Sequence, residues 1–252
     1  SSLMHIYLIE AGDRLLAGMS PESSKKAYDF LKSMGVDIQF GKMVTDYRDH
    51  KVIMKDGSEI PTRTFLWVSG IRANAMPGID ESHLGRGFRF KVDQFNRITG
   101  LDGVFAIGDQ CLQATDEAYP NGHPQVAQVA IQQAKNLAKN LKSINEGQAE
   151  SSLTAFKYNN LGSMATIGRN KAVVEIGKLR SQGFFAWILW LVVHLRSILG
   201  VKNKMMVLLN WLWKYVSYND SIRMITYATK PREVVERMER EQTTHLGEDL
   251  MD

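Results

Sequence analysis

The feature that most constrains the fold is a short apolar run that stops at a glycine and a carboxylate. Residues 104–107 are apolar and stand between turn formers, which predicts a short buried strand. The strand would end at Gly108 and Asp109, and ligands of open α/β sheets bind at the carboxyl ends of strands. Glycine lets a ligand approach the backbone, and a carboxylate accepts hydrogen bonds from hydroxyls. The pattern therefore predicts a cofactor site beside Asp109.

A helix is predicted to follow, beginning near Pro124, because proline suits the first helical turn. Its apolar side recurs with a helical period at Val126, Val129, Ala130, Ala134, Leu137, Ala138 and Leu141. A strand that ends in Gly-Asp, followed by a helix N-terminus, favours a polar and partly anionic cofactor.

These residues carry a family resemblance. Residues 99–109 read T-G-x-x-x-V-F-A-I-G-D, and the helix reads P-x-x-A-Q-x-A-x-Q-Q. The two runs together resemble the C-terminal half of flavoprotein pyridine-nucleotide oxidoreductases, and are most similar to type II NADH dehydrogenase. That family consists of single-subunit NADH:quinone oxidoreductases, so the resemblance implies an enzyme with FAD as cofactor and NADH as substrate.

The resemblance also implies roles for individual residues. Asp109, in its pair with Gly108, would hold the ribityl and phosphate region of FAD. The helix start at Ala127 and Gln128 would point at the pyrimidine edge of the flavin. Gln128 and Gln132, from the A-Q-x-x-x-Q pattern, would line the quinone pocket and orient the quinone through their carboxamides. The alternative is an ordinary turn aspartate beside an amphipathic surface helix.

Cysteine content narrows the class of oxidoreductase. The chain of 252 residues has one cysteine, Cys111, which excludes an intrachain disulfide and a cysteine metal cluster. It also lacks the redox cysteine pair that disulfide reductases need, and sulfide:quinone oxidoreductases are disfavoured. A reducing environment on the cytoplasmic side fits this composition.

The beginning of the chain resembles the end of the second strand of a dinucleotide-binding unit. Residues 4–9 predict a strand that ends at Glu10, whose carboxylate would accept hydrogen bonds from a ribose of NADH. A strand-end carboxylate without a ligand is the alternative. The G-x-G-x-x-G turns that should accompany such units occur nowhere in the sequence. We therefore expect the chain to be the C-terminal portion of a longer polypeptide, inactive alone.

Further elements are predicted along the first 75 residues. A helix would have Ser20 as N-cap and Pro21 in its first turn, and would end at Gly35. Strands are predicted over residues 36–40, 44–47 and 52–54, with a hairpin turn at residues 55–58. Residues 64–68 predict a buried strand that stops at Ser69 and Gly70. The resemblance places that stop beside NADH, and a plain turn is the alternative.

The middle of the chain predicts loops and a small sheet. Residues 113–122 predict an exposed loop, and we expect His123 to be solvated rather than a proton donor to a flavin. A polar linker is expected over residues 143–152. Residues 156–167 and 172–176 predict two strands joined by a turn at residues 168–171, and residues 158–168 again resemble type II dehydrogenases.

Two apolar, tryptophan-rich segments, residues 183–199 and 205–218, predict helices. Four of the five tryptophans lie here, Trp187, Trp190, Trp211 and Trp213, and the basic residues include Arg196, Lys202 and Lys204. No Asp or Glu occurs from residue 176 to 219. The uncharged run is shorter than the roughly 20 residues that span a bilayer, so the pattern predicts helices that lie in an anionic membrane surface. A buried hairpin or a homodimer interface is the alternative. Residues 231–241 predict a polar helix.

The expected fold class is α/β, a partial FAD/NAD(P)-binding Rossmann-like flavoprotein with a C-terminal amphipathic helical region. Residues 1–75 would form the second half of an NADH-binding domain and residues 76–145 the C-terminal part of an FAD-binding domain. Residues 153–252 would hold a small sheet, the membrane-surface helices and a polar tail. The expected function is electron transfer from NADH to a membrane quinone, on the cytoplasmic face, with no nucleic-acid partner. A membrane-surface adaptor without cofactors and a soluble flavoprotein reductase with a protein acceptor are the alternatives.

Overall fold

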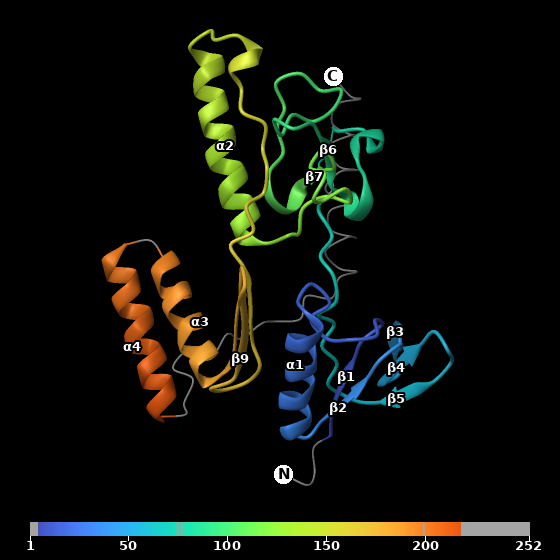
Figure 1. The fold of residues 1–252 in the computed structure, drawn as a ribbon. Coiled ribbons are helices and arrows are strands. Elements are labelled where there is room, and N and C mark those ends of the chain that lie inside the picture. The colour runs from blue at the N-terminus through green and yellow to red at the C-terminus, as the bar shows by residue number, and fades with distance from the viewer. Residues whose placement is uncertain (1–4, 75, 77, 199, 218–252) are drawn as a thin grey trace, which may run out of the picture. The chain divides into compact units, whose positions relative to one another are not determined.

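The computed structural model describes residues 5–74, 76, 78–198 and 200–217, and it has a mixed α/β fold (Figure 1). The chain divides into two compact units, Ser1–Trp190 and Leu191–Asp252. The predicted α/β class is confirmed. The predicted division into residues 1–75, 76–145 and 153–252 remains a prediction.

The first unit begins with a parallel strand pair joined by a helix. Strand β1 (Ile6–Ile9) pairs with β2 (Val36–Gln39), and α1 (Pro21–Ser33) lies between them in the chain. Ser20 caps α1 by accepting a hydrogen bond from the Ser23 backbone N–H at 3.3 Å. Gly35 follows the helix with a left-handed φ of 82°. The predicted start and end of this helix are confirmed.

An antiparallel meander follows. It consists of β3 (Val44–Arg48), β4 (Lys51–Met54) and β5 (Glu59–Pro61). The predicted hairpin turn at residues 55–58 joins β4 to β5, with Gly57 at a φ of 82° and its N–H bonded to the Met54 carbonyl. Lys42 pairs with Asp56 of this turn.

The prediction of a buried strand over residues 64–68 is wrong. None of these residues is in a strand, and the side chains of Leu66 and Val68 are 78% and 88% exposed. An apolar run becomes a buried strand only where a neighbouring strand pairs with its backbone. No described strand pairs with this run, so its apolar composition was misleading.

Two short parallel strands hold the Gly-Asp stretch. They are β6 (Phe90–Val92) and β7 (Cys111–Gln113), and the 3-10 turn η3 (Gly108–Gln110) leads directly into β7. Their core contains Phe90, Val92, Ile98, Ala106 and Cys111. Two further 3-10 turns, η1 (Glu81–His83) and η2 (Arg86–Phe88), precede β6.

The apolar run before this turn is extended, but it is not the buried strand that was predicted. Only Phe105 forms a bridge, with Arg97, and Val104 is 37% exposed. The backbone of residues 104–106 bonds instead to the nearby hairpin arm, from Ile98 N–H to Val104 O and from Ala106 N–H to Asn96 O. A local hairpin arm therefore takes the place of the expected sheet strand.

Helix α2 (Ala127–Asn145) begins at Ala127, so the predicted helix start at Ala127 and Gln128 is confirmed, but Pro124 lies three residues before it and not in the first turn. Residue Val126 is extended, with φ of −137° and ψ of 150°, and its N–H bonds to the Pro124 carbonyl. That turn ends before the helix begins. The buried residues of α2 also differ from the predicted apolar side, because two of the three, Gln133 and Asn140, are polar and only Val129 is apolar.

The first unit ends with an antiparallel sheet of β8 (Ser163–Thr166), β9 (Ala172–Ile176) and β10 (Leu179–Gly183). The predicted strand over residues 172–176 is confirmed. Of residues 156–167, only the last part forms a strand, because residues 154–162 bond to side chains of α2 instead. The 3-10 turn η4 (Glu150–Ser152) precedes this segment.

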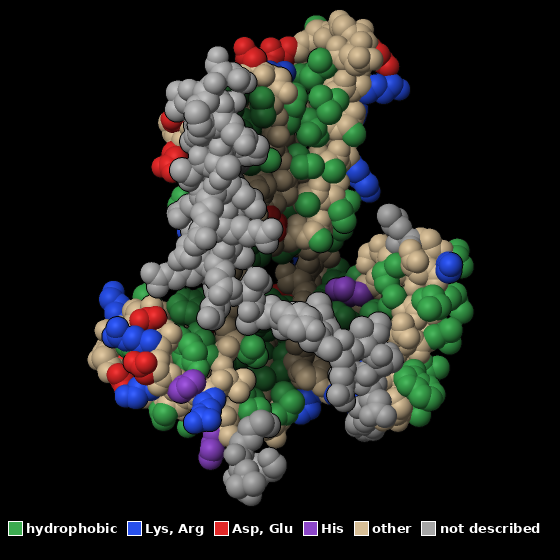
Figure 2. All heavy atoms as spheres, turned by 180° about the vertical axis from the view of Figure 1, so that it is seen from behind, with side chains coloured by type: hydrophobic (Ala, Val, Ile, Leu, Met, Phe, Trp, Pro, Cys, Tyr) green, Lys and Arg blue, Asp and Glu red, His purple; other side chains and the backbone are tan. Residues whose placement is uncertain are grey.

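The two apolar helices are confirmed as α3 (Phe184–Ser197) and α4 (Val201–Ser217). Ala186 is fully buried against Ala172 and Val174 of β9, so the start of α3 packs on the small sheet. On α4 the large apolar side chains are exposed, among them Met205, Met206, Leu209, Leu212, Trp213 and Val216. Figure 2 shows hydrophobic side chains gathered over the helical end of the described chain. None of the described helices has the length and apolar character to cross a bilayer. Tyr218 and the predicted helix at residues 231–241 lie outside the described residues.

Candidate functional site

The turn η3 presents an exposed carboxylate. Asp109 is exposed, and within the described part of the chain its side chain makes no hydrogen bond. Gly108, before it, has a left-handed φ of 64°, and a Cβ at that position would lie 3.2 Å from the Ala130 Cβ of α2. Glycine is therefore required here for close packing of the turn on the helix as well as for its backbone conformation. The carboxylate is free to accept hydrogen bonds from a ligand.

The start of α2 lies against this turn and has no side-chain cap. Gln125 donates from Nε2 to the Asp109 carbonyl at 3.2 Å, and Val126, the N-cap residue, makes no side-chain capping bond. Among the described residues, no hydrogen bond satisfies the backbone N–H groups of Ala127 and Gln128. Unsatisfied N–H groups and the positive end of a helix dipole suit the carbonyl oxygens or anionic groups of a ligand.

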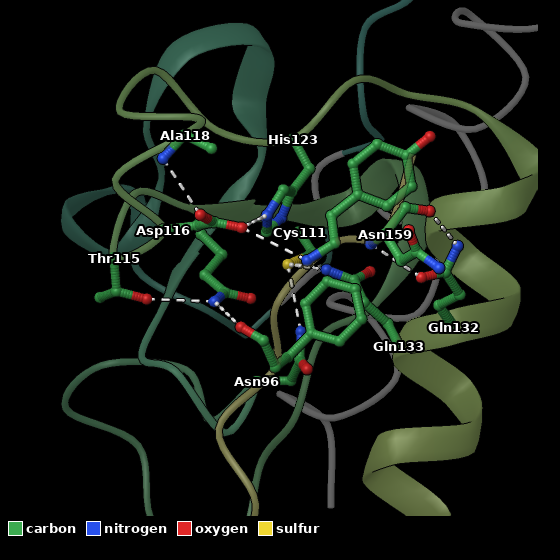
Figure 3. Close-up of polar contacts among 12 residues, drawn as sticks. Asn96, Cys111, Thr115, Asp116, Ala118, His123, Gln132, Gln133 and Asn159 are labelled. Carbon is green, nitrogen blue, oxygen red and sulfur yellow. Dashed lines mark hydrogen bonds and ion pairs between the residues drawn. The ribbon is translucent and has the colours of Figure 1, made fainter. Parts of the chain in front are cut away.

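The turn is supported from inside by buried amides (Figure 3). Gln133 accepts a hydrogen bond from the Gly108 backbone N–H at 2.7 Å and donates to the Cys111 sulfur at 3.4 Å. Asn96, which is completely buried, donates to the same sulfur at 3.4 Å and to the Ala106 carbonyl at 3.2 Å. Burial raises the pKa of the Cys111 thiol, which keeps this sulfur neutral.

The predicted quinone residues, Gln128 and Gln132, bond to a backbone segment. Gln128 donates to the Gly162 carbonyl at 2.9 Å and accepts from the Leu161 N–H at 3.1 Å. Gln132 donates to the Asn159 carbonyl at 2.9 Å and accepts from the same residue's N–H at 3.0 Å. Each carboxamide keeps a second N–H and a second lone pair, so each still has capacity for a ligand.

Two more amides continue this row along α2. Asn140 forms a two-way pair with the Thr154 backbone, with both bonds at 2.9 Å, and Asn136 donates to the Thr154 carbonyl at 2.9 Å. With Gln128 and Gln132 they stand at four-residue intervals, which places them along one ridge of the helix. We call this row the amide ladder. The spacing is visible in the sequence and could have predicted a polar partner along this ridge, but it does not identify residues 154–162 as that partner.

A buried histidine and aspartate lie beyond the turn. His123 is 1% exposed, and its Nε2 lies 2.9 Å from Oδ2 of Asp116. The rings of Tyr119, Phe156 and Tyr158 surround the imidazole at centroid distances of 5.2 to 5.9 Å. The prediction of a solvated His123 is therefore wrong, whereas most residues of the predicted loop at 113–122 are exposed.

Asp116 accepts three hydrogen bonds. Besides His123, the Ala118 N–H donates to Oδ1 at 3.1 Å and the Tyr158 N–H to Oδ2 at 3.3 Å. The His123 bond is the largest cause that lowers the pKa of this carboxyl. Asp116 thus ties the loop after β7 to the segment that the amide ladder holds.

Among the described residues, no hydrogen bond or ion pair joins the residues predicted to contact NADH. Glu10 lies at the end of β1, as predicted, but its Oε1 accepts a bond of 2.7 Å from the Gly12 N–H. Ser69 and Gly70 are exposed and lie on the segment that forms no strand. Their roles remain predictions.

The predicted membrane residues lie on α3 and α4. Trp213 is 62% exposed, whereas Trp187, Trp190 and Trp211 are half-buried. The basic residues Arg196 and Lys202 are exposed, and Lys204 is half-buried. Apolar and cationic side chains thus share these helices.

The chemistry of the Asp109 turn fits a flavin nucleotide better than a metal. One acceptor carboxylate lies on the turn beside a helix start with unsatisfied backbone donors, which matches a ligand that carries hydroxyls on one part and carbonyl oxygens on another. A cation would need several oxygen, nitrogen or sulfur ligands together. The described residues contain no group of three or more His, Cys, Asp or Glu side chains placed to hold one.

Comparison with known proteins identifies the family. Residues 2–134 match the model of the pyridine nucleotide-disulphide oxidoreductase family, and residues 160–217 match the model of the NDH2 C-terminal domain. Among solved structures, NDH2 of Plasmodium falciparum in complex with NADH has the same fold, with a TM-score of 0.77 at 16% sequence identity. That match covers 87% of this chain and 60% of the other.

Curated relatives agree with these matches. A type II NADH:quinone oxidoreductase of Mycobacterium tuberculosis is 34% identical over 86% of this chain and 47% of its own length. The type II NADH:quinone oxidoreductase of Haemophilus influenzae is 31% identical over 86% of this chain and 50% of its own length. The chain thus spans about half the length of these relatives. It belongs to the pyridine nucleotide-disulphide oxidoreductase family and, within that family, to the type II NADH dehydrogenases.

Proposed function

We propose that the protein that carries this chain is an FAD-dependent NADH:quinone oxidoreductase that works at a membrane surface. The observation that carries the proposal is the free Asp109 carboxylate beside the uncapped start of α2. When bound there, the flavin would supply the redox chemistry, taking a hydride from NADH and passing two electrons to a quinone. The protein would supply binding and orientation.

Each part of the site has one task in this proposal. Asp109 would accept hydrogen bonds from the ribityl region of FAD, and Gly108 would allow the turn to pack closely on α2. The backbone N–H groups of Ala127 and Gln128 would bind the carbonyl edge of the flavin ring. Glu10 would bind a ribose of NADH, with Ser69 and Gly70 beside the same substrate.

Gln128 and Gln132 would orient the quinone with the amide hydrogens that the backbone leaves unused. Each carboxamide is held by residues 159–162, so its orientation is set before a ligand arrives. A preorganised donor loses less conformational entropy when it binds a carbonyl. This arrangement supports a role for both residues in quinone binding.

The C-terminal helices would hold the protein on the cytoplasmic face of the membrane. Exposed apolar side chains on α4 and the basic residues Arg196, Lys202 and Lys204 support this, because no acidic residue accompanies them between residues 176 and 219. Each lysine near anionic headgroups adds about 1 kcal/mol of attraction. A homodimer through the same helices is compatible with membrane attachment.

Half-reaction kinetics test the enzymatic proposal. In the purified protein that carries this chain, Gln128→Ala should leave the rate of flavin reduction by NADH near that of the wild type. It should slow reoxidation by quinone about tenfold, since one good hydrogen bond is worth up to about 1.5 kcal/mol. Equal losses in both half-reactions would refute the quinone role, and a colourless protein without FAD would refute the enzymatic proposal.

Flotation with liposomes tests the membrane proposal. Anionic vesicles should carry the protein upward in a gradient, and neutral vesicles should carry less of it. Replacing Lys202 and Lys204 by glutamine should reduce the difference between the two vesicle types. Absence of flotation with anionic vesicles would remove the basis for a membrane quinone as acceptor.

A further inference from the structure

One buried side chain of α2 bridges the turn that carries Asp109. Gln133 is 1% exposed, accepts from the Gly108 N–H and donates to the Cys111 sulfur. Because a backbone N–H can only donate, the bond to Gly108 fixes which end of the carboxamide faces which partner. The single carboxamide therefore joins the residues on either side of Asp109 and Gln110.

The two bonds of this bridge differ in strength. The bond from Gly108 is 2.7 Å long and has an oxygen acceptor, whereas sulfur is a weak acceptor and lies 3.4 Å away. Asn96 also donates to the Cys111 sulfur, and it donates to the Ala106 carbonyl of the segment before the turn. Gln133 is thus the side chain of α2 that holds the backbone immediately before Asp109.

The Asp109 side chain interacts electrostatically with Arg89 but is held by no hydrogen bond among the described residues. Its direction therefore depends largely on the backbone of its turn, which Gln125 holds from outside at the Asp109 carbonyl and Gln133 holds from inside at the Gly108 N–H. That backbone includes Gly108 at a φ of 64°, where glycine is the most conformationally free residue. A glycine next to a binding carboxylate loses entropy on binding unless another group already restrains it.

We infer that Gln133 is a positioning residue for Asp109: it restrains the turn from Gly108 to Cys111 and so orders the carboxylate before a flavin nucleotide binds. The inference rests on the proposed flavin-binding function. It differs from the roles of Gln128 and Gln132, because Gln133 is buried and would touch no ligand. Its loss should weaken FAD binding through the turn.

Two variants of α2 separate positioning from general stability. Gln133→Met keeps the length of the side chain and removes both hydrogen bonds. Asn140→Leu is the matched control, because Asn140 is also a buried amide of α2, 2% exposed, and loses two hydrogen bonds to the Thr154 backbone. Both variants should unfold at lower temperature than the wild type.

The measurements are FAD affinity in flavin-depleted protein, by fluorescence titration, and hydrogen exchange of the peptide over residues 105–113. Gln133→Met should weaken FAD binding about three- to tenfold, the value of one hydrogen bond. It should also speed exchange of the Gly108 amide without flavin, and Asn140→Leu should change neither by more than about twofold.

Three outcomes overturn the inference. If Gln133→Met binds FAD as tightly as the wild type, the inference is refuted. The proposed function is not affected by that result, because the wild type still binds FAD. Equal loss of FAD affinity in Asn140→Leu shows that both variants act through stability alone. If the wild-type protein binds no FAD, both the proposed function and the inference are refuted. This result is obtained before any variant is measured.

Discussion

The substitution Asp116→Asn probes the buried pair that ties the loop after β7 to residues 154–162. The carboxylate accepts from His123 and Tyr158 at Oδ2 and from Ala118 at Oδ1. Asparagine has the same shape, but its nitrogen cannot accept a hydrogen bond. With the amide oxygen facing His123 and Tyr158, the amide nitrogen faces the Ala118 N–H, and one donor loses its acceptor.

The expected cost is about 2 kcal/mol. Leaving a buried donor unsatisfied costs roughly 1 to 3 kcal/mol, and the bond to His123 also loses its charged acceptor. Asp116 is 8% exposed, so water can replace little of this loss. For a unit of this size, a change of 1 kcal/mol shifts the melting temperature by about 2 to 4 °C, so the variant should melt about 4 to 8 °C lower.

Differential scanning calorimetry near neutral pH measures the shift. Asp80→Asn is the control, because Asp80 is an exposed carboxylate that caps η1 by accepting from the Ser82 N–H, and asparagine caps equally well. It should melt within about 1 °C of the wild type. Equal melting temperatures for Asp116→Asn and Asp80→Asn would show that the buried pair contributes nothing.

Acid gives a second measurement on the same variant. The His123 bond lowers the pKa of Asp116 in the folded protein, so its stabilisation is present above the ordinary carboxyl pKa of about 3.9. It is lost as the pH falls through the lowered folded pKa. The melting difference between wild type and Asp116→Asn should therefore shrink below about pH 4. A difference that stays constant down to about pH 2 would contradict this origin.

Two other substitutions test the packing around the turn and the start of α1. Gly108→Ala should cost about 2 kcal/mol, from left-handed strain and a Cβ placed 3.2 Å from Ala130. Gly103→Ala is the control, because Gly103 has a φ of 73° and no atom lies near its Cβ, so it should cost only the backbone strain of about 1 kcal/mol. If urea titration gives equal losses of stability for the two variants, the close contact with Ala130 contributes nothing. Glu175→Gln should lower stability by about 1 to 2 kcal/mol, because the carboxylate accepts from the capping serine of α1. Burial disfavours the charged form of Glu175, but the hydrogen bonds from the serines outweigh this and lower its pKa. The stability lost in Glu175→Gln should therefore become smaller in acid, where the wild-type carboxylate is protonated. A loss that does not change with pH would refute the assignment.

Local signals predicted the elements that depend on local contacts. The Ser20-Pro21 start and Gly35 end of α1 are set by capping and by a left-handed residue, which act within a few positions. The strand predicted at residues 64–68 failed because a strand depends on a partner elsewhere in the fold. Apolar composition alone does not supply that partner.

In the candidate site, too, the features set by local sequence could be predicted and those set by distant residues could not. The position of Asp109 beside the start of α2 followed from a motif, and the structure places both together. The burial of His123 did not follow, because it depends on Asp116 and on aromatic rings up to 35 residues away in the sequence. In the sequence alone, the residues of this pair cannot be told from those of an ordinary polar loop.

The amide ladder has a consequence for how this part of the chain can change during evolution. Gln128, Gln132, Asn136 and Asn140 bind backbone atoms of residues 154–162, so this pairing uses the main chain of that segment and not its side chains. On the helix the pairing uses side chains, and inserting or deleting one residue rotates everything after it by about 100°. Relatives should therefore keep the length of α2 and the spacing of its amides.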